Sequence, residues 1–500
     1  MDRSVLGVLA PTLQYKVFHW SDRDYAVINM SFKAAYAIGL VSMGALIDRI
    51  GTRAGYALSI AIWSLFGMLH ALVRPAFSLL GFSLARFGLG FGESGNFPAA
   101  IKTTGEWFPG RERAFANGIF NAGANVGAIL APLVIPMFVL PDGTHWQYAF
   151  LISGVFSLAW VIVWLKVYQP PEINPRVSAA ELTYIRSDSP PVTPGARIPW
   201  RKVLPLPETW AFALGKITDA VWWFYLFWGG KYLYDRFGLD LKGLALPLII
   251  IFFVADAGSI GGGWLSSSFI KRGWSVNRAR KTAMLVSALC VLPVVLVTRV
   301  STRFNVNDAF FSRLATARVA TNTVVVVEGR THVEKIAEPV SPMDQVALRA
   351  LSGRSYGSAK EFTVAAAAVI SPGSEGRAES ALVASARSDQ FYWIAVLLIA
   401  LAAAGHQAWS ANLFTLVSDV FPKAATASVI GIGGMVGAVS GILADWSLGR
   451  VLSSSGPDGY LFAFLIAGLI YLFFLGVVQL LMPHMTPLGE DLRHSLSHEP

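Results

Sequence analysis

Two ionisable residues stand in the middle of an apolar segment that is long enough to cross a lipid bilayer. Residues 77–109 read FSLLGFSLARFGLGFGESGNFPAAIKTTGEWFP, and Arg86 and Glu93 are two helical turns apart with Gly90 between them. An ionisable group at that depth costs roughly 2.5–3.5 kcal/mol on insertion scales, so such groups usually face a water-filled cavity. We interpret the pair as a substrate or proton site. The alternative is a buried ion pair that only holds helices together.

The composition indicates a polytopic membrane protein. Of the 500 residues, 54% are hydrophobic and only 14% are charged, whereas soluble domains carry roughly 25% charged residues. The net charge of +9 then indicates cytoplasmic anchoring, and its spread between apolar runs argues against nucleic-acid binding. Neither a metal-ligand spacing of His and Cys nor a phosphate-binding G-x-x-x-x-G-K-[ST] loop occurs, which disfavours metal catalysis and an ATP-driven pump. The single Cys290 is expected to pack as a small hydrophobe.

The apolar runs predict twelve spans, of which the first is short. Residues 4–13 form only half of a spanning helix, so we expect the given start to be an internal methionine. The full spans are expected at 25–47, 54–73, 77–101, 114–139, 146–168, 209–234, 244–270, 281–299, 390–417, 425–450 and 459–482. Basic loops at 48–53, 102–113, 169–207 and 271–281 all fall on one side, which predicts cytoplasmic termini.

The two halves of the chain repeat. GALIDRIGTR (44–53) matches GGWLSSSFIKRGWS (262–275) with Gly51 opposite Gly273, and the Phe-Pro pair at 108–109 matches that at 421–422. The two offsets differ, which locates a polar insertion in the second half outside the membrane. We therefore expect six segments: 1–168 first six-helix bundle, 169–207 cytoplasmic linker, 208–299 helices 7–9, 300–389 extracytoplasmic insertion, 390–482 helices 10–12, 483–500 cytoplasmic tail.

The insertion contains ten basic and nine acidic residues and no apolar span. TNTVVVVEGRTHVEKI predicts a strand pair around Glu328-Gly329, and KEFTVAAAAVI predicts a strand or a short helix. A small folded domain and a disordered loop are both compatible with this pattern, and we favour the domain.

The stretch 44–53 resembles the signature loop of the major facilitator superfamily, G-x-L-x-D-R-x-G-x-R, between helices 2 and 3. Its matching residues are Gly44, Asp48, Arg49, Gly51 and Arg53. The resemblance implies an all-α membrane protein made of two six-helix bundles, whose halves this loop latches together in one state. The second-half copy has Ser266-Ser267 where an acidic residue would stand, so we expect a one-sided latch.

Longer stretches resemble the anion:cation symporter family and, within it, bacterial hexuronate transporters. They are Asp2-Arg3, 20–39, 84–109, 115–132, 215–233, 262–281 and 405–422. The resemblance implies proton-coupled import of a hexuronate such as glucuronate or galacturonate by alternating access, without a cofactor, by a monomer in a bacterial inner membrane. The alternatives are symport of another sugar acid such as an aldonate, or a transport-deficient relative, because of the short start and the insertion.

A hexuronate carries one carboxylate and several hydroxyl groups, and its symport requires an acid that binds H⁺. Arg3 is the candidate for the carboxylate because a guanidinium binds that group in a bidentate manner. Asp2 and Glu93 are the candidate proton carriers, with Arg86 as the counter-charge of Glu93. Substrate that engages the arginine would release the acid to take up a proton, which would couple the two fluxes.

Amide and phenol groups on two helices are candidates for the sugar hydroxyls. They are Tyr36 on helix 2 and Asn121 and Asn125, which lie one turn apart on helix 5. For the two asparagines, hydrogen bonds between helices are the alternative.

The second half offers further candidates on helices 7 and 10. Lys216 is a second carboxylate candidate, although a Lys216–Asp219 structural pair is the alternative. Trp222 and Trp223 are further substrate-binding candidates, as part of a gate, and an interfacial belt is their alternative. The repeat places His406 opposite Glu93. The residues expected to complete the sugar pocket are His406, Gln407, Trp409, Ser410 and Asn412. A hydrogen-bonded packing role is the alternative for the histidine.

Overall fold

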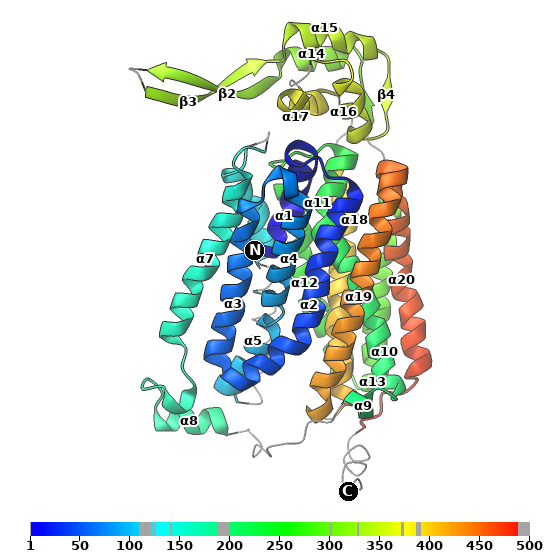
Figure 1. Cartoon of the computed structure of the whole chain (residues 1–500). Coiled ribbons are helices and arrows are strands. Elements are labelled where there is room, and N and C mark those ends of the chain that lie inside the picture. The colour runs from blue at the N-terminus through cyan, green and yellow to red at the C-terminus, as the bar shows by residue number, and fades with distance from the viewer. Residues whose placement is uncertain are drawn as a thin grey trace.

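The computed structural model is helical over most of its length. It describes residues 2–109, 116, 123, 126–140, 143–187, 200–300, 303–327, 330–371, 375–386, 392–421 and 423–488. The helices run alongside one another in a bundle, with a smaller helix-and-strand unit at one end (Figure 1). The end that carries this unit is called the insertion side, and the opposite end, where α8 (Ala179–Arg186) lies, is called the linker side.

The first half consists of helices packed against α2 and α3. Its elements are α1 (Asp2–Pro11), the π-helix η1 (Thr12–Val17), α2 (Asp22–Ile50), α3 (Thr52–Leu69), η2 (His70–Leu72), η3 (Pro75–Phe77), α4 (Ser78–Glu93), α5 (Asn96–Trp107), a helical stretch at 126–134, η4 (Ile135–Met137) and α7 (Trp146–Val167). A capping box starts α2, since Ser21 accepts from the Asp24 backbone and Asp24 accepts from the Ser21 backbone.

The second half repeats this architecture. It contains α9 (Trp200–Val203), α10 (Pro207–Gly215), η6 (Lys216–Thr218), α11 (Asp219–Phe237), α12 (Ala245–Lys271), α13 (Val276–Val291), η7 (Leu292–Arg299), α18 (Tyr392–Val420), α19 (Lys423–Ser455), η9 (Gly456–Gly459) and α20 (Tyr460–Leu481). Gly51 after α2 and Gly273 after α12 have φ of 84° and 87°, a backbone conformation that favours glycine. The repeat predicted from these glycines thus recurs in the backbone.

One predicted span is broken where the sequence suggested a continuous helix. The expected helix at 77–101 divides into α4 and α5, with a turn at Ser94 and Gly95. Pro98 has no N–H to bond the carbonyl one turn earlier, but it is tolerated in the first turn of a new helix that starts at Asn96. A similar break at η6 divides the span expected at 209–234.

The insertion folds into short helices and strands around a small core of its own. Its elements are β1 (Phe304–Asn305), α14 (Asp308–Thr316), β2 (Arg318–Val327), β3 (Arg330–Pro339), α15 (Pro342–Leu348), η8 (Arg349–Leu351), β4 (Ser355–Tyr356), α16 (Ala359–Ala367) and α17 (Glu375–Ala386). β2 and β3 pair antiparallel with Val327 opposite Arg330, which confirms the predicted strand pair. Phe304, Phe310 and Phe362 are fully buried in the core. The KEFTVAAAAVI stretch is a helix, α16.

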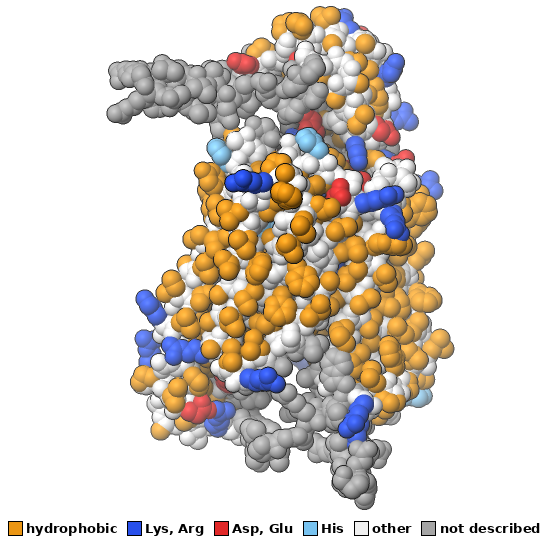
Figure 2. Space-filling view, viewed as in Figure 1, with side chains coloured by type: hydrophobic (Ala, Val, Ile, Leu, Met, Phe, Trp, Pro, Cys, Tyr) orange, Lys and Arg blue, Asp and Glu red, His pale blue; other side chains and the backbone are white. Residues whose placement is uncertain are grey.

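Apolar side chains cover the middle of the bundle, and most charged ones lie towards its ends (Figure 2). Six helical stretches in the described residues are long and apolar enough to cross a membrane: Thr52–Leu72, Trp146–Val167, Ala245–Lys271, Val276–Arg299, Tyr392–Val420 and Ser428–Leu481, the last of which includes α19 and α20. α2 is long as well but carries charged residues, and α4 and α5 are short because of the break. The chain has the organisation of a multi-pass membrane protein.

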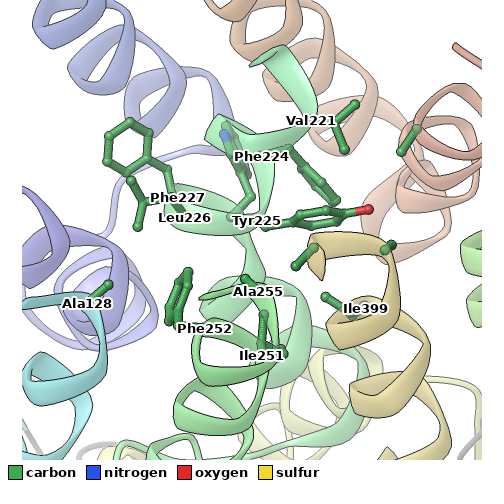
Figure 3. Close-up of a cluster of buried hydrophobic side chains, with 14 of the residues drawn as sticks. Ala128, Val221, Phe224, Tyr225, Leu226, Phe227, Ile251, Phe252, Ala255 and Ile399 are labelled. Carbon is green, nitrogen blue, oxygen red and sulfur yellow. The ribbon is translucent and has the colours of Figure 1, made fainter. Parts of the chain in front are cut away.

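Close helix contacts join the two halves. A Cβ on Gly7 of α1 would lie 2.6 Å from the carbonyl oxygen of Leu226 on α11, and a Cβ on Gly449 of α19 would lie 2.6 Å from Cβ of Ala26 on α2. Around α11, aromatic side chains pack with residues of α12 and α18 in one apolar cluster (Figure 3). The second half thus meets α1 through α11 and α2 through α19.

Candidate functional site

The acid predicted as a proton carrier forms an ion pair across two helices of the first half. Nη1 of Arg3 on α1 lies 3.2 Å from Oε1 of Glu93 at the end of α4, and the two side chains are 16% and 17% exposed. The sequence interpretation paired Glu93 with Arg86 instead. Seven residues span about 10 Å of a helix, so Arg86 lies about 10 Å from Glu93, nearer the start of α4. The direct partner of Glu93 is Arg3.

Arg86 is fully buried beside this pair. Its Nη1 donates to the backbone carbonyl of Arg3 at 3.2 Å, and its guanidinium carbon lies 4.7 Å from the ring centre of Phe32 and 5.1 Å from that of Phe227. Nε and Nη2 have no hydrogen-bond partner among the described residues. Arg86 therefore positions the backbone of Arg3 and links α4 to α2 and α11 by cation–π contact.

Asp2 lies on the side of α1 that faces α7. Its Oδ2 accepts a hydrogen bond of 2.7 Å from the hydroxyl of Ser157, and the side chain is buried. Consecutive residues of α1 thus place one carboxylate and one guanidinium against two different helices of the first half. Both predicted proton carriers therefore neighbour Arg3. Asp2 precedes it in the chain, and Glu93 forms an ion pair with it.

An aromatic surface adjoins the arginines. Tyr36 stacks on Phe32 with ring centres 5.9 Å apart, and it meets Trp223 of α11 edge to face at 6.2 Å. Tyr36 and Trp223, both predicted to contact the sugar, are therefore brought together from the two halves. A flat apolar surface of this kind suits the face of a sugar ring, while cations nearby suit its carboxylate.

Lys216 and Asp219 form the ion pair that the sequence left as an alternative. Lys216 Nζ lies 2.5 Å from Asp219 Oδ2, one turn away, and 4.5 Å from the ring centre of Phe414 on α18. The lysine side chain is buried, whereas that of Asp219 is about one fifth exposed. In this state the lysine is already matched by an acid, as Arg3 is.

His406 is held by two aromatic residues. Its ring stacks on Trp222 at 5.5 Å, and its Nδ1 lies 2.7 Å from the hydroxyl of Tyr471 on α20. Trp409, fully buried, meets Tyr471 edge to face at 5.4 Å. The repeat partner of Glu93 is thus a buried, hydrogen-bonded histidine.

The other predicted pocket residues differ in their surroundings. Asn412 is fully buried and donates to the carbonyls of Gly262 at 3.0 Å and Ala408 at 2.9 Å, so it joins α18 to α12. Gln407 and Ser410 are half-buried on α18. The predicted Asn121 and Asn125 lie outside the described residues.

Residues 1–323 match the family model described as Major Facilitator Superfamily, which is more than half of the chain. The chain belongs to the Major Facilitator Superfamily. The family and the relatives below are transporters, so the chain is not classed with enzymes.

Curated relatives within the superfamily are transporters of sugar acids. The galacturonate transporter of Dickeya chrysanthemi is 32% identical over 298 residues, which cover 58% of this chain and 84% of the relative. The hexuronate transporter of Escherichia coli K12 is 31% identical over 59% of this chain and 67% of its own length. A D-galactonate transporter of Escherichia coli is 29% identical over 58% of this chain and 68% of its own length.

Solved structures of transporters share the fold at low sequence identity. A bacterial homologue of the human lysosomal transporter Spinster, in an inward-facing and occupied conformation, aligns with a TM-score of 0.61 at 15% identity, covering 96% of this chain and 93% of the other. A D-xylose-proton symporter aligns with a TM-score of 0.57 at 12% identity, covering 97% and 94% of the two chains.

The superfamily signature stretch lies on the linker side, at the end of α2 and the start of α3. Arg53 donates to the backbone carbonyl of Leu165, and the indole of Trp164 on α7 donates to the carbonyl of Arg53 at 3.0 Å. Arg49 is exposed, and a Cβ on Gly44 would meet no atom within 4 Å. The side chain of Asp48 is outside the described residues. The contacts described here hold the loop against α7 of its own half.

A buried ion pair between the halves escaped the sequence interpretation. Nζ of Lys33 on α2 lies 2.6 Å from Oδ2 of Asp445 on α19, and the two side chains are 1% and 2% exposed. Trp228 donates its indole N–H to the other carboxylate oxygen at 2.9 Å. The criterion that singled out Arg86, an ionisable residue in an apolar run, applies equally to Lys33 and Asp445 and could have found them.

A second charged cluster lies closer to the insertion side. Lys231 of α11 lies 2.9 Å from Asp22 of α2, donates to Tyr15 at 2.6 Å, and pairs with Asp235 one turn along. The insertion contributes Lys360, 3.6 Å from Asp22. This cluster also joins the two halves of the helix bundle.

Proposed function

We propose that this chain is a proton-coupled symporter that imports a hexuronate such as glucuronate or galacturonate by alternating access. The observation that carries the proposal is the Arg3–Glu93 ion pair, a cation suited to a carboxylate that is held by a titratable acid. Sugar-acid transport by curated relatives supports the substrate class.

The paired charges provide a route from substrate binding to proton binding. A substrate carboxylate that binds Arg3 competes with Glu93 for the same guanidinium. Glu93, released from Arg3, is then free to bind the proton that crosses the membrane with the substrate. The loaded site then holds one organic anion and one proton, and neither species is bound without the other. Asp2, next to Arg3, is the second acid proposed to take part.

The remaining contacts of the substrate are proposed from the geometry around this pair. Tyr36 and Trp223 form the surface for the sugar ring, and Lys216, paired with Asp219, is a second cation within reach of a ligand. His406, Trp222 and Gln407 are proposed to line the second-half side. We assign Asn412 a packing role because its amide N–H groups donate to two backbone carbonyls.

The proposed membrane arrangement follows from the charged loops and the position of the insertion. We propose a bacterial inner-membrane protein with the C-terminus and the 169–207 linker in the cytoplasm, and with the 300–389 insertion outside. The 1–168 and 208–299 plus 390–482 bundles are the two rocking halves. The linker-side and insertion-side ends in Figure 1 are then the cytoplasmic and extracytoplasmic faces.

The experiment that tests the proposal is uptake of labelled glucuronate and galacturonate into proteoliposomes, with and without an inward pH gradient. Accumulation above the external concentration is expected only with the gradient. Uptake that is indifferent to the gradient would refute proton coupling. Because a curated relative transports galactonate, the same panel includes an aldonate, and accumulation of the aldonate alone would replace the substrate class.

Substitution Glu93→Gln separates exchange from accumulation. The glutamine keeps the size of the side chain but cannot carry a proton, so substrate exchange between loaded liposomes is expected to continue, while gradient-driven accumulation falls at least tenfold. Glu181→Gln, at an exposed position on α8, is the matched control and is expected to accumulate substrate as the parent does. Unchanged accumulation in Glu93→Gln would make Glu93 a structural residue.

A further inference from the structure

The Lys33–Asp445 ion pair joins two helices that belong to opposite halves. Lys33 is eleven residues beyond the start of α2 on the insertion side, which places its Cα about 16 Å along the helix, near the middle of a bilayer core of about 30 Å. Asp445 reaches it from α19. The pair thus lies at the depth of the candidate substrate site and not in a surface loop.

Each member of the pair also has a hydrogen-bond partner of its own in this arrangement. Lys33 Nζ also donates to the carbonyl of Gly441 at 3.1 Å, and its charge lies 5.6 Å and 5.4 Å from the ring centres of Trp223 and Phe227. A Cβ on Gly441 would lie 3.0 Å from Trp223 and 3.2 Å from Cδ of Lys33, so the absence of a side chain there lets α19 approach α2. The pair can form only while the two helices are in close contact.

The surrounding charges make the pair sensitive to the loss of either partner. Arg86 of α4 shares the Phe227 ring with Lys33, so Lys33 is close to a second buried cation. Without Asp445, the two buried cations would lie near each other without the acid that neutralises Lys33. Without Lys33, the carboxylate of Asp445 would keep only the indole N–H of Trp228. A buried charge without its partner strongly favours any state that admits water.

We propose that Lys33 and Asp445 are positioning residues of the transport cycle, which together latch the insertion side shut at the depth of the substrate site. This inference rests on the proposed alternating access, but it does not depend on which acid is carried. Opening of the insertion side separates α2 from α19 at Ala26 and Gly449, and it must part the pair. Closing restores it. The two charges thereby bias the equilibrium between the two faces.

The test uses a reporter cysteine between the halves. In a Cys290→Ser background, Ala26→Cys places a thiol at a position that is 3% exposed and faces Gly449. Purified protein in nanodiscs is treated with a water-soluble maleimide, without substrate. Lys33→Met and Asp445→Asn are each expected to speed labelling of this thiol at least tenfold. The double variant Lys33→Met/Asp445→Leu is expected to label faster than the parent, because the attraction between the halves is lost, but more slowly than either single variant, because no charge of the pair is left without its partner.

The controls separate a latch from general loosening. Arg280→Met breaks an ion pair of 2.9 Å with Asp419 that lies within the second half, and it is expected to leave labelling unchanged. Single variants that label like the parent overturn the latch. If they do not fold, the double variant decides alone, and labelling of it no faster than the parent overturns the latch. If labelling follows the expected pattern while glucuronate uptake fails, only the substrate proposal falls.

Discussion

Arg86 shows how a buried charge can serve the site without touching the acid next to it. Its guanidinium lies against two aromatic rings from different halves and supports the carbonyl of Arg3. A planar, delocalised cation suits all three contacts at once, which an ammonium group cannot do. The residue that first drew attention in the sequence is therefore a support for Arg3.

Substitution Arg86→Lys is expected to lower the free energy of unfolding by about 2 kcal/mol, because cation–π contact with two rings and the bond to Arg3 are lost together. Thermal unfolding in detergent measures this as a lower midpoint. Arg74→Lys, at an exposed loop position, serves as the control and should change the free energy by no more than about 0.5 kcal/mol. Equal midpoints for both variants would contradict the supporting role.

At this scale, the sequence identified where charges are buried but not how they pair. The position of Arg86 and Glu93 in an apolar run was enough to flag both. The partner of Glu93 depends on side-chain direction and on the short α1, neither of which spacing reveals. The same criterion could have flagged Lys33 and Asp445, but not their pairing, because they lie far apart in the chain and only the packing of α2 on α19 brings them together.

Helix contacts in the second half depend on the absence of side chains at particular positions. A Cβ on Gly262 of α12 would lie 2.5 Å from Cα and Cβ of Ala408 on α18, and the Gly262 carbonyl accepts from Asn412. Gly261, the preceding residue, is exposed, and a Cβ there would meet no atom within 4 Å. The two neighbours thus provide a matched pair on the same helix.

Gly262→Ala is expected to destabilise the protein by about 1–3 kcal/mol, because an added methyl group forces α12 and α18 apart. Gly261→Ala should be neutral or slightly stabilising, since alanine favours a helix over glycine. Midpoints of thermal unfolding for the two variants in the same detergent give the comparison. A common shift in both would mean that helix propensity, not packing, dominates at these positions.

The positions of most long apolar helices could be predicted from the sequence, because hydrophobic length is a direct consequence of the bilayer. The span expected at 114–139 lies partly outside the described residues. Breaks within them were harder to predict. Pro98 marks the start of α5, but a span of apolar residues on both sides hides it, and the 3-10 turn at Lys216–Thr218 has no comparable signal. The strand pair of the insertion was predictable because a run of valines, which favour strands, is followed by the dipeptide Glu-Gly, a sequence typical of a turn.

The insertion contacts both halves although it is connected only to the second. Glu379 on α17 lies 3.1 Å from Lys16 of η1 and accepts from Tyr234 of α11, and Lys360 on α16 lies near Asp22 of α2. Its connections to η7 and α18 both belong to the second half. If the halves separate at this end, the contacts of the insertion with η1 and α2 must therefore break.

Glu379→Gln is expected to loosen the insertion from the bundle, because it removes the charge that pairs with Lys16. Hydrogen exchange in α16 and α17 should rise about fivefold, a modest change that befits a partly exposed ion pair. Glu361→Gln makes the same substitution at an exposed position, where the carboxylate accepts a hydrogen bond from the Gly357 backbone within the insertion. This control variant should show the same hydrogen exchange as the parent. Equal exchange in the two variants would mean that apolar contacts alone hold the insertion against the helix bundle.

The matched charges of the Lys33–Asp445 pair have an electrical consequence. A membrane potential does work of about 2.3 kcal/mol per elementary charge per 100 mV, but only on net charge that moves across the bilayer. A cation and an anion that separate at the same depth in the membrane move no net charge across the bilayer. We therefore expect opening at α2 and α19 to be insensitive to voltage, so that any voltage dependence of uptake reports the cargo itself: none for a monoanion carried with one proton, and an inward positive current for each additional proton.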